Sequence, residues 1–360
     1  MSKYVTKLKI ERCEKLDKQG YRRSKMQCKL DALLRRLPPQ HEKYLQIESD
    51  LGKRRSGDFG ENSIDYYLSQ LSEVQDCIIV KGARLLLNKH HFQMDTLLLF
   101  PSFFILLETK HLTGTLLFDP DYQQLIQIKK EDINLEISRH DPILQVKMQY
   151  NQFKRWLANH NKEGYPGFCF VGVTNQNAIV KALSNPTLVQ EFVVRSPALT
   201  FKINDILANQ QPKRSTRFSP QEISFLITNH HAPRNVNILK DYNIGALEIL
   251  TGVACPNCNK LAMEKLPRKW SCPFCKHQSK DAHISTLIDY SFLFGTSISI
   301  REVCRVLHIN NIRSARRMIN ELSLKRIGTT YNSRYCLKSL VEQQNAPRLK
   351  GAFVNFVLLD

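Results

Sequence analysis

The sequence of 360 residues predicts an α/β fold, in which a mixed β-sheet flanked by helices is followed by a cysteine-bearing module and a small helical domain. Three observations support this prediction. A helix, several strands, a second helix and a buried strand follow one another between residues 58 and 173, which is the element order of an α/β domain. Two C-x2-C pairs lie between residues 255 and 275. Two helical patterns then follow between residues 299 and 324.

The composition indicates a folded chain with a polyanionic partner. Hydrophobic residues make up 42% and charged residues 24%, which excludes a mostly disordered chain. The net charge is +19, of which residues 1–40 carry +8 and residues 265–340 carry +10, so the rest carries +1. Positive charge concentrated at the two ends predicts binding to nucleic acid, most often DNA, because neutralised phosphates release condensed counterions. A solubilising surface or attraction to an anionic membrane are the alternatives.

Hydropathy and cysteine usage favour a cytoplasmic protein without a membrane partner. No apolar run reaches the roughly 20 residues that a membrane helix needs, and the longest, from Thr96 to Leu107, contains Pro101. The N-terminus has no apolar stretch after its basic residues, so we expect no signal peptide. Ten cysteines are too sparse for a disulfide scaffold, and four of them are spaced as metal ligands would be, which favours a reducing compartment.

The first elements are basic and helical. Residues 1–37 predict mostly helical segments that stop at Pro38-Pro39, and a linker rich in charge and glycine is expected around residues 52–57. From Asp58 a helix is expected, with Glu61 and Ile64 among the residues on one face.

The sheet and its second helix come next. Strand-like runs are expected at residues 77–80, 84–87, 92–100, 103–110, 114–118 and 125–129. Asp141-Pro142 has the form of an N-cap with proline in the first turn, so a helix is expected from there to about Asn159. A buried strand follows at residues 168–173. Between residues 175 and 250 we expect a loop at 210–216 and, at Ser219-Pro220-Gln221-Glu222, a capping box for a short helix ending near His230.

Asp95 and the triplet Glu108-Thr109-Lys110 carry the most chemical information. Glu108 and Lys110 are two apart on a strand and therefore share a face. A turn centred on Pro101-Ser102 with an even loop places Asp95 opposite Glu108, with Cβ atoms roughly 5 Å apart, whereas an odd loop would place the two carboxylates on opposite faces.

Two opposed carboxylates on an apolar hairpin repel each other unless a positive charge lies between them. Hard oxygen ligands fit Mg²⁺ or Mn²⁺, and a neighbouring lysine fits a role in orienting water or stabilising a phosphoryl transition state. The alternative is a structural Asp–Lys or Glu–Lys pair at the end of the sheet.

Two further side chains are candidates for the same site. Glu61 lies on the apolar face of its helix, one turn before Ile64, where a charge needs a partner. Interaction with the helix N-terminus is the alternative role for Glu61. Gln145 lies in the first turn of the helix that begins at Pro142, and its alternative role is that of a surface glutamine.

Taken in order, these motifs resemble the nuclease-related domain (NERD), a branch of the PD-(D/E)XK, restriction-endonuclease-like superfamily. The resemblance covers about residues 55–175. It is carried by Gly57-Asp58-Phe59-Gly60-Glu61, Gln93-Met94-Asp95, Glu108-Thr109-Lys110 with Gly114, and Asp141-Pro142-Ile143-Leu144-Gln145.

The resemblance implies a restriction-endonuclease-like core and a role for each candidate. Asp95 and Glu108 would hold Mg²⁺ or Mn²⁺, and Glu61 would be a third ligand or would orient one through water. Lys110 would be the catalytic lysine, and Gln145 would position water or phosphate. The family often has Asn before the proline where this chain has Asp, which affects the assignment of Gln145 most.

The cysteine module has the spacing of a metal site. Cys255-Pro-Asn-Cys258 and Cys272-Pro-Phe-Cys275 are separated by thirteen residues. Four thiolates in two short knuckles form the tetrahedral soft site that structural Zn²⁺ prefers, with two disulfides or an iron–sulfur site as alternatives. The module resembles the zinc ribbons of topoisomerases and other DNA-handling proteins. Four residues of its loop fit contacts to phosphates and bases, namely Lys265, Arg268, Lys269 and Trp270.

The helical patterns at residues 299–307 and 312–324 resemble a winged helix-turn-helix. Arg313, Arg316 and Arg317 lie in the first half of the second helix, where a recognition helix contacts DNA. Lys325 and Arg326 begin a basic hairpin that would form the wing. A helical bundle with a solvated basic face is the alternative. The tail at residues 352–359 is too apolar to be free, so we expect it to dock on a domain, a second copy of the chain or another protein.

The expected domains are a basic helical segment (1–50), the nuclease-like domain (51–175), an extension (176–250), the zinc ribbon (251–280), the winged-helix-like domain (281–340) and the apolar tail (341–360). The sequence predicts a metal-dependent endonuclease that hydrolyses phosphodiester bonds in DNA processing or repair. The alternative is a non-catalytic DNA-binding or signalling protein with a degenerate nuclease fold.

Overall fold

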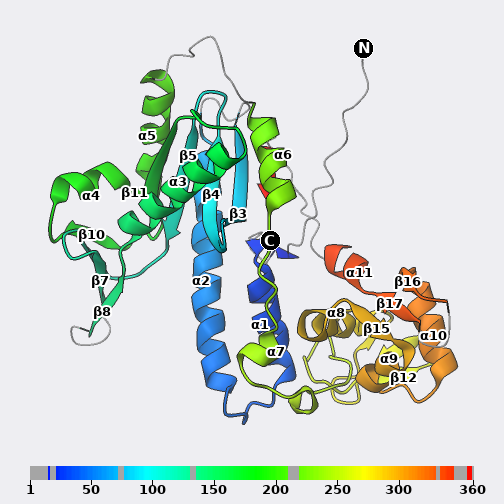
Figure 1. The fold of residues 1–360 in the computed structure, drawn as a ribbon. Coiled ribbons are helices and arrows are strands. Elements are labelled where there is room, and N and C mark those ends of the chain that lie inside the picture. Colours follow the sequence, from blue (N-terminus) through cyan, green and yellow to red (C-terminus); the bar gives the residue numbers. More distant parts are fainter. Residues whose placement is uncertain are drawn as a thin grey trace, which may run out of the picture. The chain divides into compact units, whose positions relative to one another are not determined.

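The computed structural model describes residues 15–16, 22–71, 77–129, 135–209, 219–329, 333–343 and 355–358, so the loop expected at residues 210–216 lies outside the described residues. The chain forms two compact units (Figure 1). Of the described residues, unit 1 contains those from 56 to 234 together with 355–358, and unit 2 contains those from 15 to 55 and from 235 to 343. No helix among the described residues is both long and apolar enough to cross a membrane.

Unit 1 is built on a six-stranded mixed sheet with the strand order β11-β9-β5-β4-β3-β18. β3, β4 and β5 are antiparallel neighbours, while β9 runs parallel to β5, β11 parallel to β9, and β18 parallel to β3. The strands are β3 (Ile78–Leu87), β4 (His90–Leu99), β5 (Phe104–Lys110), β9 (Gly167–Val173), β11 (Val193–Arg195) and β18 (Asn355–Leu358).

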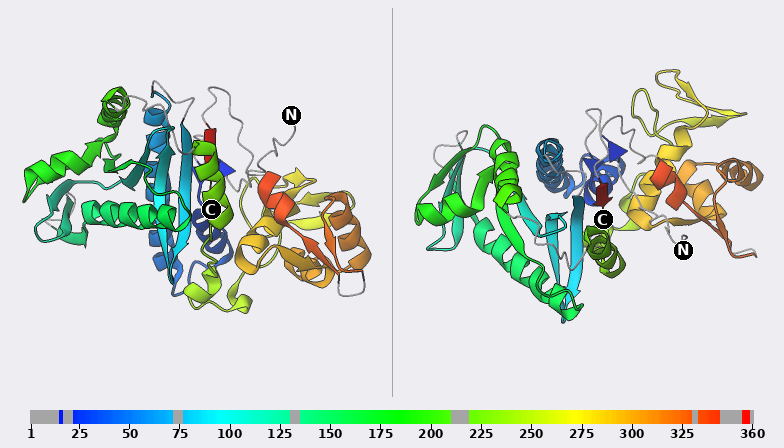
Figure 2. Two further views of the ribbon diagram at one scale, coloured as in Figure 1. Left: turned by 45° about the horizontal axis from the view of Figure 1, so that its top comes forward. Right: turned by 90° about the horizontal axis from the view of Figure 1, so that it is seen from above.

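Helices cover both faces of this sheet, as expected (Figure 2). Leu97, Leu99 and Leu106 pack on one side with α3 (Pro142–Asn159) and α6 (Pro220–His230). Leu98 and Leu107 pack on the other side with α5 (Ser196–Asn209) and the second half of α2 (Tyr44–Leu68). The alternation of side chains along β4 and β5 thus gives two apolar clusters, one on each face.

A second, four-stranded sheet completes unit 1, in the order β10-β6-β7-β8. Its strands are β6 (Thr115–Asp119), β7 (Gln124–Lys129), β8 (Leu135–His140) and β10 (Ile179–Ala182), and α4 (Pro186–Phe192) follows. The sequence pattern gave no indication of β8 and β10, whose residues are mostly exposed and lack the apolar alternation of a half-buried strand.

Several expected element ends are confirmed. The side chain of Asp141 accepts a hydrogen bond from the backbone N–H of Ile143, and α3 ends at Asn159. Ser219 likewise accepts from the N–H of Glu222 and caps α6. The last described residues also agree with the expectation for the tail, because β18 pairs with β3 and forms the edge of the sheet.

The expectation of a linker around residues 52–57 is wrong. α2 runs without a break from Tyr44 to Leu68, through both Gly52 and Gly57. Each glycine costs a helix about 1 kcal/mol relative to alanine. Apolar side chains of the same helix offset this cost, because residues such as Leu51 and Ile64 are completely or almost completely buried.

The break expected between residues 80 and 84 is also absent. Gly82 lies inside β3 with φ = +68°, a backbone conformation that glycine adopts without steric cost. The two short runs of the sequence pattern therefore form one ten-residue strand.

Unit 2 begins with a short antiparallel pair, β1 (Lys15–Leu16) and β2 (Arg22–Arg23), and the helix α1 (Lys25–Arg36). α1 packs on α8 (Ala282–Phe294), where Arg36 donates to Oδ2 of Asp289 (3.0 Å) and to the carbonyl oxygen of Gly252 (2.6 Å). The first half of α2 joins the same apolar core, as do α7 (Ile238–Asp241) and residues that flank the 3-10 helix η2 (Ala246–Glu248).

The remainder of unit 2 contains two small sheets. The cysteine module forms the antiparallel sheet β12 (Glu264–Leu266), β13 (Lys269–Ser271) and β14 (Gln278–Ser279). After α8 come β15 (Ser297–Ser299), α9 (Ile300–Leu307), α10 (Ile312–Glu321), β16 (Arg326–Ile327), β17 (Arg334–Cys336) and α11 (Lys338–Gln343). The strands of this last part pair in the order β15-β17-β16.

Candidate active site and nucleic-acid interface

The β4–β5 hairpin has the even loop that the carboxylate pairing needs. Leu99 pairs with Phe104 and the register continues to Thr96 opposite Leu107. The N–H of Phe100 donates to the carbonyl oxygen of Phe103 (2.9 Å) and closes the loop. Asp95 and Glu108 directly follow the pair of Thr96 with Leu107 in this register. There the N–H of Thr109 donates to Oδ2 of Asp95 (3.1 Å). Asp95 and Glu108 therefore come together at the open end of the hairpin.

Gly82 of the neighbouring strand β3 lies opposite Asp95. The β3–β4 register runs from Lys81 opposite Thr96 to Ala83 opposite Met94 and skips the position between them, where Gly82 faces Asp95. The positive φ of Gly82 changes the path of β3 at this point. In the sequence, a glycine between two strand-like runs indicates a strand end and gives no sign of this role.

Glu108 is the most deeply buried carboxylate of the site, with 2% of its surface exposed. Its Oε1 accepts from Nζ of Lys110 (2.5 Å), and its Oε2 accepts from Nε2 of Gln149 (3.0 Å). Nζ of Lys110 also donates to Oε1 of Gln145 (3.0 Å). The structure thus joins three of the expected residues, and it adds Gln149, which lies one helical turn after Gln145 on α3 and could have been found from that spacing.

Asp95 has a strongly perturbed pKa. Burial raises the pKa of this carboxyl well above its usual value, and the negative charges of Glu108 and Glu61 raise it further. The N–H of Thr109 and the charge of Lys110 oppose the shift only in part. A carboxylate in this position is stabilised by added positive charge.

Glu61 reaches the site through a close contact of α2 with the end of β5. The ring of Phe59 lies edge-on to His111, with centroids 5.1 Å apart. A Cβ atom on Gly60 would lie 2.4 Å from Cβ of His111, so only glycine allows this approach. Nζ of Lys81 donates to the carbonyl oxygen of Glu61 (2.9 Å) and holds the helix from the sheet side. Sequence reasoning did not select Lys81 or His111.

Among the described residues, the oxygens of Glu61, Asp95 and Glu108 do not all lie close enough together to hold one metal ion. In the part of the chain that the structure describes, one group of three or more potential metal ligands is close enough to hold an ion, and it consists of Cys255, Cys258, Cys272 and Cys275. Glu61 acts on Asp95 electrostatically, and one oxygen of Glu108 is already bonded to Lys110. A cation at these carboxylates would share Glu108 with Lys110 and Gln149, because each carboxylate oxygen keeps a second lone pair.

The four cysteine sulfurs lie within 4.8 Å of one another. Sγ of Cys255 is 3.5 Å from that of Cys275, and Sγ of Cys258 is 3.6 Å from that of Cys272. Backbone N–H groups lower the pKa of the Cys275 and Cys272 thiols, whereas burial and the neighbouring sulfurs raise that of Cys258, so the four thiols do not ionise independently. Because the thiolate is the form that binds metal, the module could hold a metal ion, as its spacing predicts.

Trp270 does not fit the role expected of it. It is 1% exposed, and its Nε1 donates to Nδ1 of His283 (3.1 Å), so it belongs to the core of unit 2 and its ring is not free to stack on bases. Phe274 is the exposed aromatic residue of this module, with 61% of its surface accessible, and Nζ of Lys260 lies 4.0 Å from its ring centre. Lys265 and Lys269 are half-buried and Arg268 is exposed at the β12–β13 turn.

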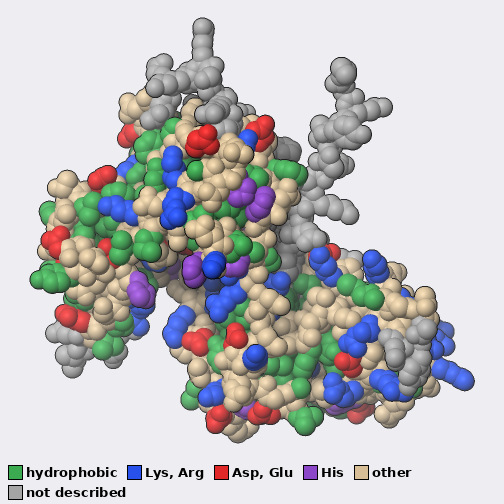
Figure 3. All heavy atoms as spheres, viewed as in Figure 1, with side chains coloured by type: hydrophobic (Ala, Val, Ile, Leu, Met, Phe, Trp, Pro, Cys, Tyr) green, Lys and Arg blue, Asp and Glu red, His purple; other side chains and the backbone are tan. Residues whose placement is uncertain are grey.

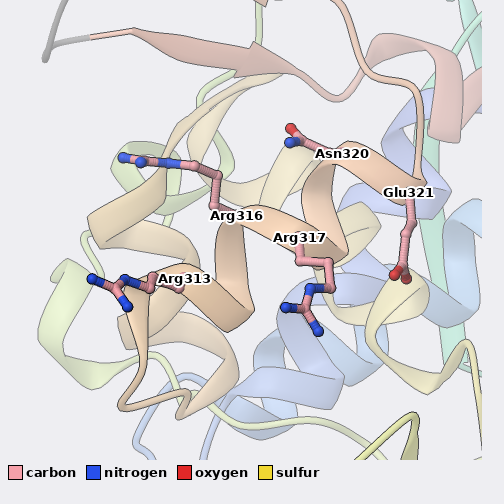
Figure 4. Close-up of a pocket in the computed structure, with 5 residues that line it drawn as sticks. All are labelled: Arg313, Arg316, Arg317, Asn320 and Glu321. Atoms are coloured by element: carbon pink, nitrogen blue, oxygen red, sulfur yellow. The ribbon is translucent and has the colours of Figure 1, made fainter.

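The other basic candidates are exposed on and after α10. Met318 and Ile319 hold one face of α10 against the core. The opposite face borders an open hollow of about 540 Å³, lined by Arg313, Arg316, Arg317, Asn320 and Glu321 (Figure 4). Lys325 and Arg326 are exposed at the start of the β16–β17 hairpin. Figure 3 shows basic side chains gathered over this part of unit 2.

Comparison with known families identifies one domain. Residues 56–174 match the family model of the nuclease-related domain. The matched residues include Glu61, Asp95, Glu108, Lys110 and Gln145. No curated protein and no solved structure matches the chain. The domain match indicates a nuclease-related function that involves nucleic acid, and the match lies within unit 1.

Proposed function

We propose that unit 1 is a metal-dependent endonuclease that hydrolyses phosphodiester bonds in DNA, and that unit 2 holds the DNA. The observation that carries the proposal is the convergence of Asp95, Glu108, Lys110 and Gln145 at one end of the β4–β5 hairpin, inside the nuclease-related domain. Two carboxylates, a lysine and an amide that converge in this way, with one carboxyl whose pKa is strongly raised, form a candidate functional site.

The donors fit a divalent cation. Carboxylate and amide oxygens are the ligands that Mg²⁺ and Mn²⁺ prefer, and the raised pKa of Asp95 indicates that the site gains from added positive charge. Asp95 and Glu108 would hold the ion, with Glu61 as a third ligand or as a residue that orients one through water. A bound ion would polarise the scissile phosphate and stabilise the charge of the transition state.

The protein's own side chains then have separate roles. Lys110, held between Glu108 and Gln145, would orient the attacking water or stabilise the phosphoryl transition state. Gln145 would position water or phosphate. Gln149 holds the second oxygen of Glu108 and so fixes the direction of that carboxylate.

Unit 2 has the charge for DNA binding. Its two segments, residues 12–55 and 235–348, contain 30 Lys and Arg against 14 Asp and Glu, a net charge of +16. Residues 56–234 of unit 1 contain 18 against 17, a net charge of +1. Because affinity for DNA rises with the number of phosphates neutralised, unit 2 would contribute most of the binding affinity.

Two parts of unit 2 would contact DNA. The order α8, β15, α9, α10, β16, β17 supports a winged helix-turn-helix, with α10 as the recognition helix and the hairpin from Lys325 as the wing. The four cysteines would bind a structural Zn²⁺ and leave no open position for chemistry. On this ribbon Lys265, Arg268 and Lys269 would contact phosphates, and Phe274 replaces Trp270 as the aromatic contact.

A cleavage assay tests the catalytic proposal. Purified protein is incubated with plasmid or single-stranded DNA and Mg²⁺ or Mn²⁺, beside Asp95→Ala, Lys110→Ala and the exposed control Lys89→Ala. We expect cleavage by the wild type and the control and at least a 100-fold loss in the other two, a typical effect of removing one catalytic group. Equal nicking by all four proteins would refute the proposal.

One observation favours a second candidate, a DNA-binding protein without turnover. Lys110 already neutralises Glu108, and among the described residues the carboxylate oxygens do not all lie close enough together to hold one metal ion. A purely structural ion pair would have the same geometry. In that case the cleavage assay shows no activity for the wild type, while the DNA affinity of unit 2 is unchanged.

A further inference from the structure

Lys81 is a buried cation to which the proposed reaction gives no role. It lies on β3 with 4% of its surface exposed. Ile79, two residues earlier and therefore on the same face of the strand, packs with Ile64 of α2, so the side chain of Lys81 also points to the α2 side of the sheet. A buried ammonium group is unfavourable unless it is paired and hydrogen-bonded. The partners of Lys81 therefore indicate what its burial achieves.

The two partners of Lys81 lie one helical turn apart on α2. Its Nζ donates to the carbonyl oxygen of Glu61 (2.9 Å) and to Oδ1 of Asp65. The ion pair with Asp65 alone would neutralise the lysine. A carbonyl group inside a helix already accepts from the N–H four residues later, so the bond to Glu61 is additional and ties β3 to the helix backbone at that residue. Two anchors one turn apart fix both the position and the rotation of α2 on the sheet.

The same segment of β3 borders the candidate active site. Gly82, which directly follows Lys81, faces Asp95. After burial and the charge of Glu108, the charge of Glu61 is a further cause of the raised pKa of Asp95, so the carboxylates of Glu61 and Asp95 lie near each other. Successive residues of a helix are about 100° apart around its axis, so a rotation of α2 by one residue would turn Glu61 away from Asp95. The bonds from Lys81 oppose such a rotation.

We propose that Lys81 is a positioning residue for Glu61, which it holds beside Asp95 for the proposed metal-dependent reaction. The inference rests on the proposed function of unit 1 and adds a residue outside its five candidates. A purely structural lysine would stabilise the packing of α2, and its loss would lower activity only as far as the protein unfolds. A positioning lysine affects the site of the folded protein, and only while Glu61 carries its carboxylate.

The test is a double-mutant cycle in the full-length protein with Lys81→Met and Glu61→Gln. Methionine has nearly the length and volume of lysine but makes neither hydrogen bond. Calorimetry measures Mn²⁺ affinity in the absence of DNA, and cleavage assays measure kcat and KM. We expect each single variant to lower Mn²⁺ affinity and kcat by about 10-fold or more, with KM for DNA unchanged. The double variant should be no weaker than Glu61→Gln alone, because Lys81 then has no carboxylate to position.

The direction of the change separates positioning from charge. Removal of a positive charge near the site would by itself raise Mn²⁺ affinity, so a fall in affinity reports that Glu61 has moved. Lys89→Met, which removes the same charge from the exposed turn between β3 and β4, is the matched control and should keep the wild-type affinity and kcat.

A further variant keeps the test valid if Lys81→Met alone does not fold. Lys81→Met combined with Asp65→Leu replaces the ion pair by an apolar pair and leaves no unpaired charge. It should unfold near the wild-type urea midpoint and show the same loss of Mn²⁺ affinity as Lys81→Met.

Two outcomes would overturn the inference while the proposed function stands. One is wild-type Mn²⁺ affinity and kcat in the folded variant that lacks Lys81. The other is an equal loss from Lys81→Met with and without the carboxylate of Glu61, which would show that the lysine acts independently of that residue. If the wild type neither binds Mn²⁺ nor cleaves DNA, the proposed function fails and this inference fails with it.

Discussion

At the scale of single residues, Gln149 sets the direction of the buried carboxylate of Glu108. Its Nε2 donates to Oε2, while Lys110 bonds to the other oxygen. Gln149→Leu leaves Oε2 buried without this donor, which typically costs about 1–3 kcal/mol. We expect a lower cleavage rate and a lower urea midpoint, measured beside Asn151→Ala, which removes an exposed amide from the same helix. A variant as active as the control would show that Gln149 does not position Glu108.

His283 is a second residue whose environment makes a measurable prediction. Burial, followed by the charge of Lys265, lowers the pKa of His283 to about 4. An unfolded histidine has a pKa of about 6.5, so between these values the unfolded chain binds more protons and stability falls as the pH falls. The contribution, up to about 3 kcal/mol, is fully present above pH 6.5 and is lost as the pH drops through 4.

The measurement is urea unfolding of the full chain at several pH values in a Trp156→Phe background, so that the fluorescence reports on the buried Trp270 alone. If the cysteines hold a metal ion, its loss at low pH would affect wild type and variant alike, so the informative quantity is the difference between wild type and His283→Gln. That difference should change between pH 6.5 and 4. A pH-independent difference would contradict the lowered pKa of His283.

Single residues also show what a sequence can reveal about a site. Asp95, Glu108 and Lys110 are predictable because strand periodicity and loop parity are local properties. Gln149 could be found from its spacing to Gln145, but its bond to Glu108 and the role of Lys81 depend on how α3 and α2 pack on the sheet. The role expected of Trp270 is wrong for the same reason, since its spacing does not tell whether it faces His283 or solvent.

At the scale of elements, α2 offers a direct comparison between glycines. A Cβ on Gly60 would lie 2.4 Å from Cβ of His111, whereas a Cβ on Gly52 or Gly57 would meet nothing within 4 Å. Gly52→Ala should stabilise the protein by about 0.5–1 kcal/mol through helix propensity. Gly60→Ala gains the same propensity but forces α2 away from β5 and should cost about 1–3 kcal/mol net.

The sign of the change in free energy of unfolding is the measurement, with cleavage activity as a second readout. Because Gly60 precedes Glu61, the displaced helix should also reduce activity in Gly60→Ala and leave Gly52→Ala unaffected. Similar stability and activity of the two variants would mean that the contact with His111 does not constrain the helix.

The elements themselves were predictable where the signal is local. The N-cap at Asp141 and the proline after it indicated the start of α3, and the hairpin was set by Pro101-Ser102 between two apolar runs. Glycine was misleading twice. In α2, burial of apolar side chains outweighs the tendency of Gly52 and Gly57 to end a helix. In β3, Gly82 adopts a positive φ and the strand continues through it. Strands β8 and β10 lack an apolar pattern and depend on their sheet neighbours.

The cysteine module makes a prediction about metal. If the four thiols hold Zn²⁺, metal analysis should find one tightly bound zinc, and Cys272→Ser should lose it. The knuckles would then lose their order, because metal binding and folding are coupled in such modules. DNA affinity should fall as well, whereas the folding of unit 1 should be retained. If the purified protein contains no zinc but has normal stability and DNA affinity, the cysteines are not a structural zinc site.

At the scale of the whole molecule, charge and chemistry belong to different units. The candidate carboxylates and Lys110 lie in unit 1, whose residues 56–234 carry +1, while the segments of unit 2 carry +16. Division of the +19 by sequence position already indicated this separation. The structure sharpens it by assigning the described residues of both segments, from 15 to 55 and from 235 to 343, to one folded unit.

The separation predicts that binding and turnover can be changed independently. Replacement of Arg313, Arg316 and Arg317 by glutamine should raise KM for DNA and leave kcat unchanged, because these residues lie outside the unit that carries Lys110. The slope of log K against log salt should fall by about 0.9 for each phosphate that the variant no longer neutralises.

The matched control replaces Lys89, Arg155 and Lys181, which are exposed residues of unit 1, with glutamine. Both triple variants have the same total charge, so any difference between them reports where the charge lies. We expect the control to keep most of the wild-type salt slope and KM, because DNA seated on unit 2 gains little from isolated cations on a nearly neutral surface. An equal reduction of the slope in the two variants would mean that DNA responds to the overall charge of the chain. The claim that unit 2 provides most of the DNA affinity would then be wrong.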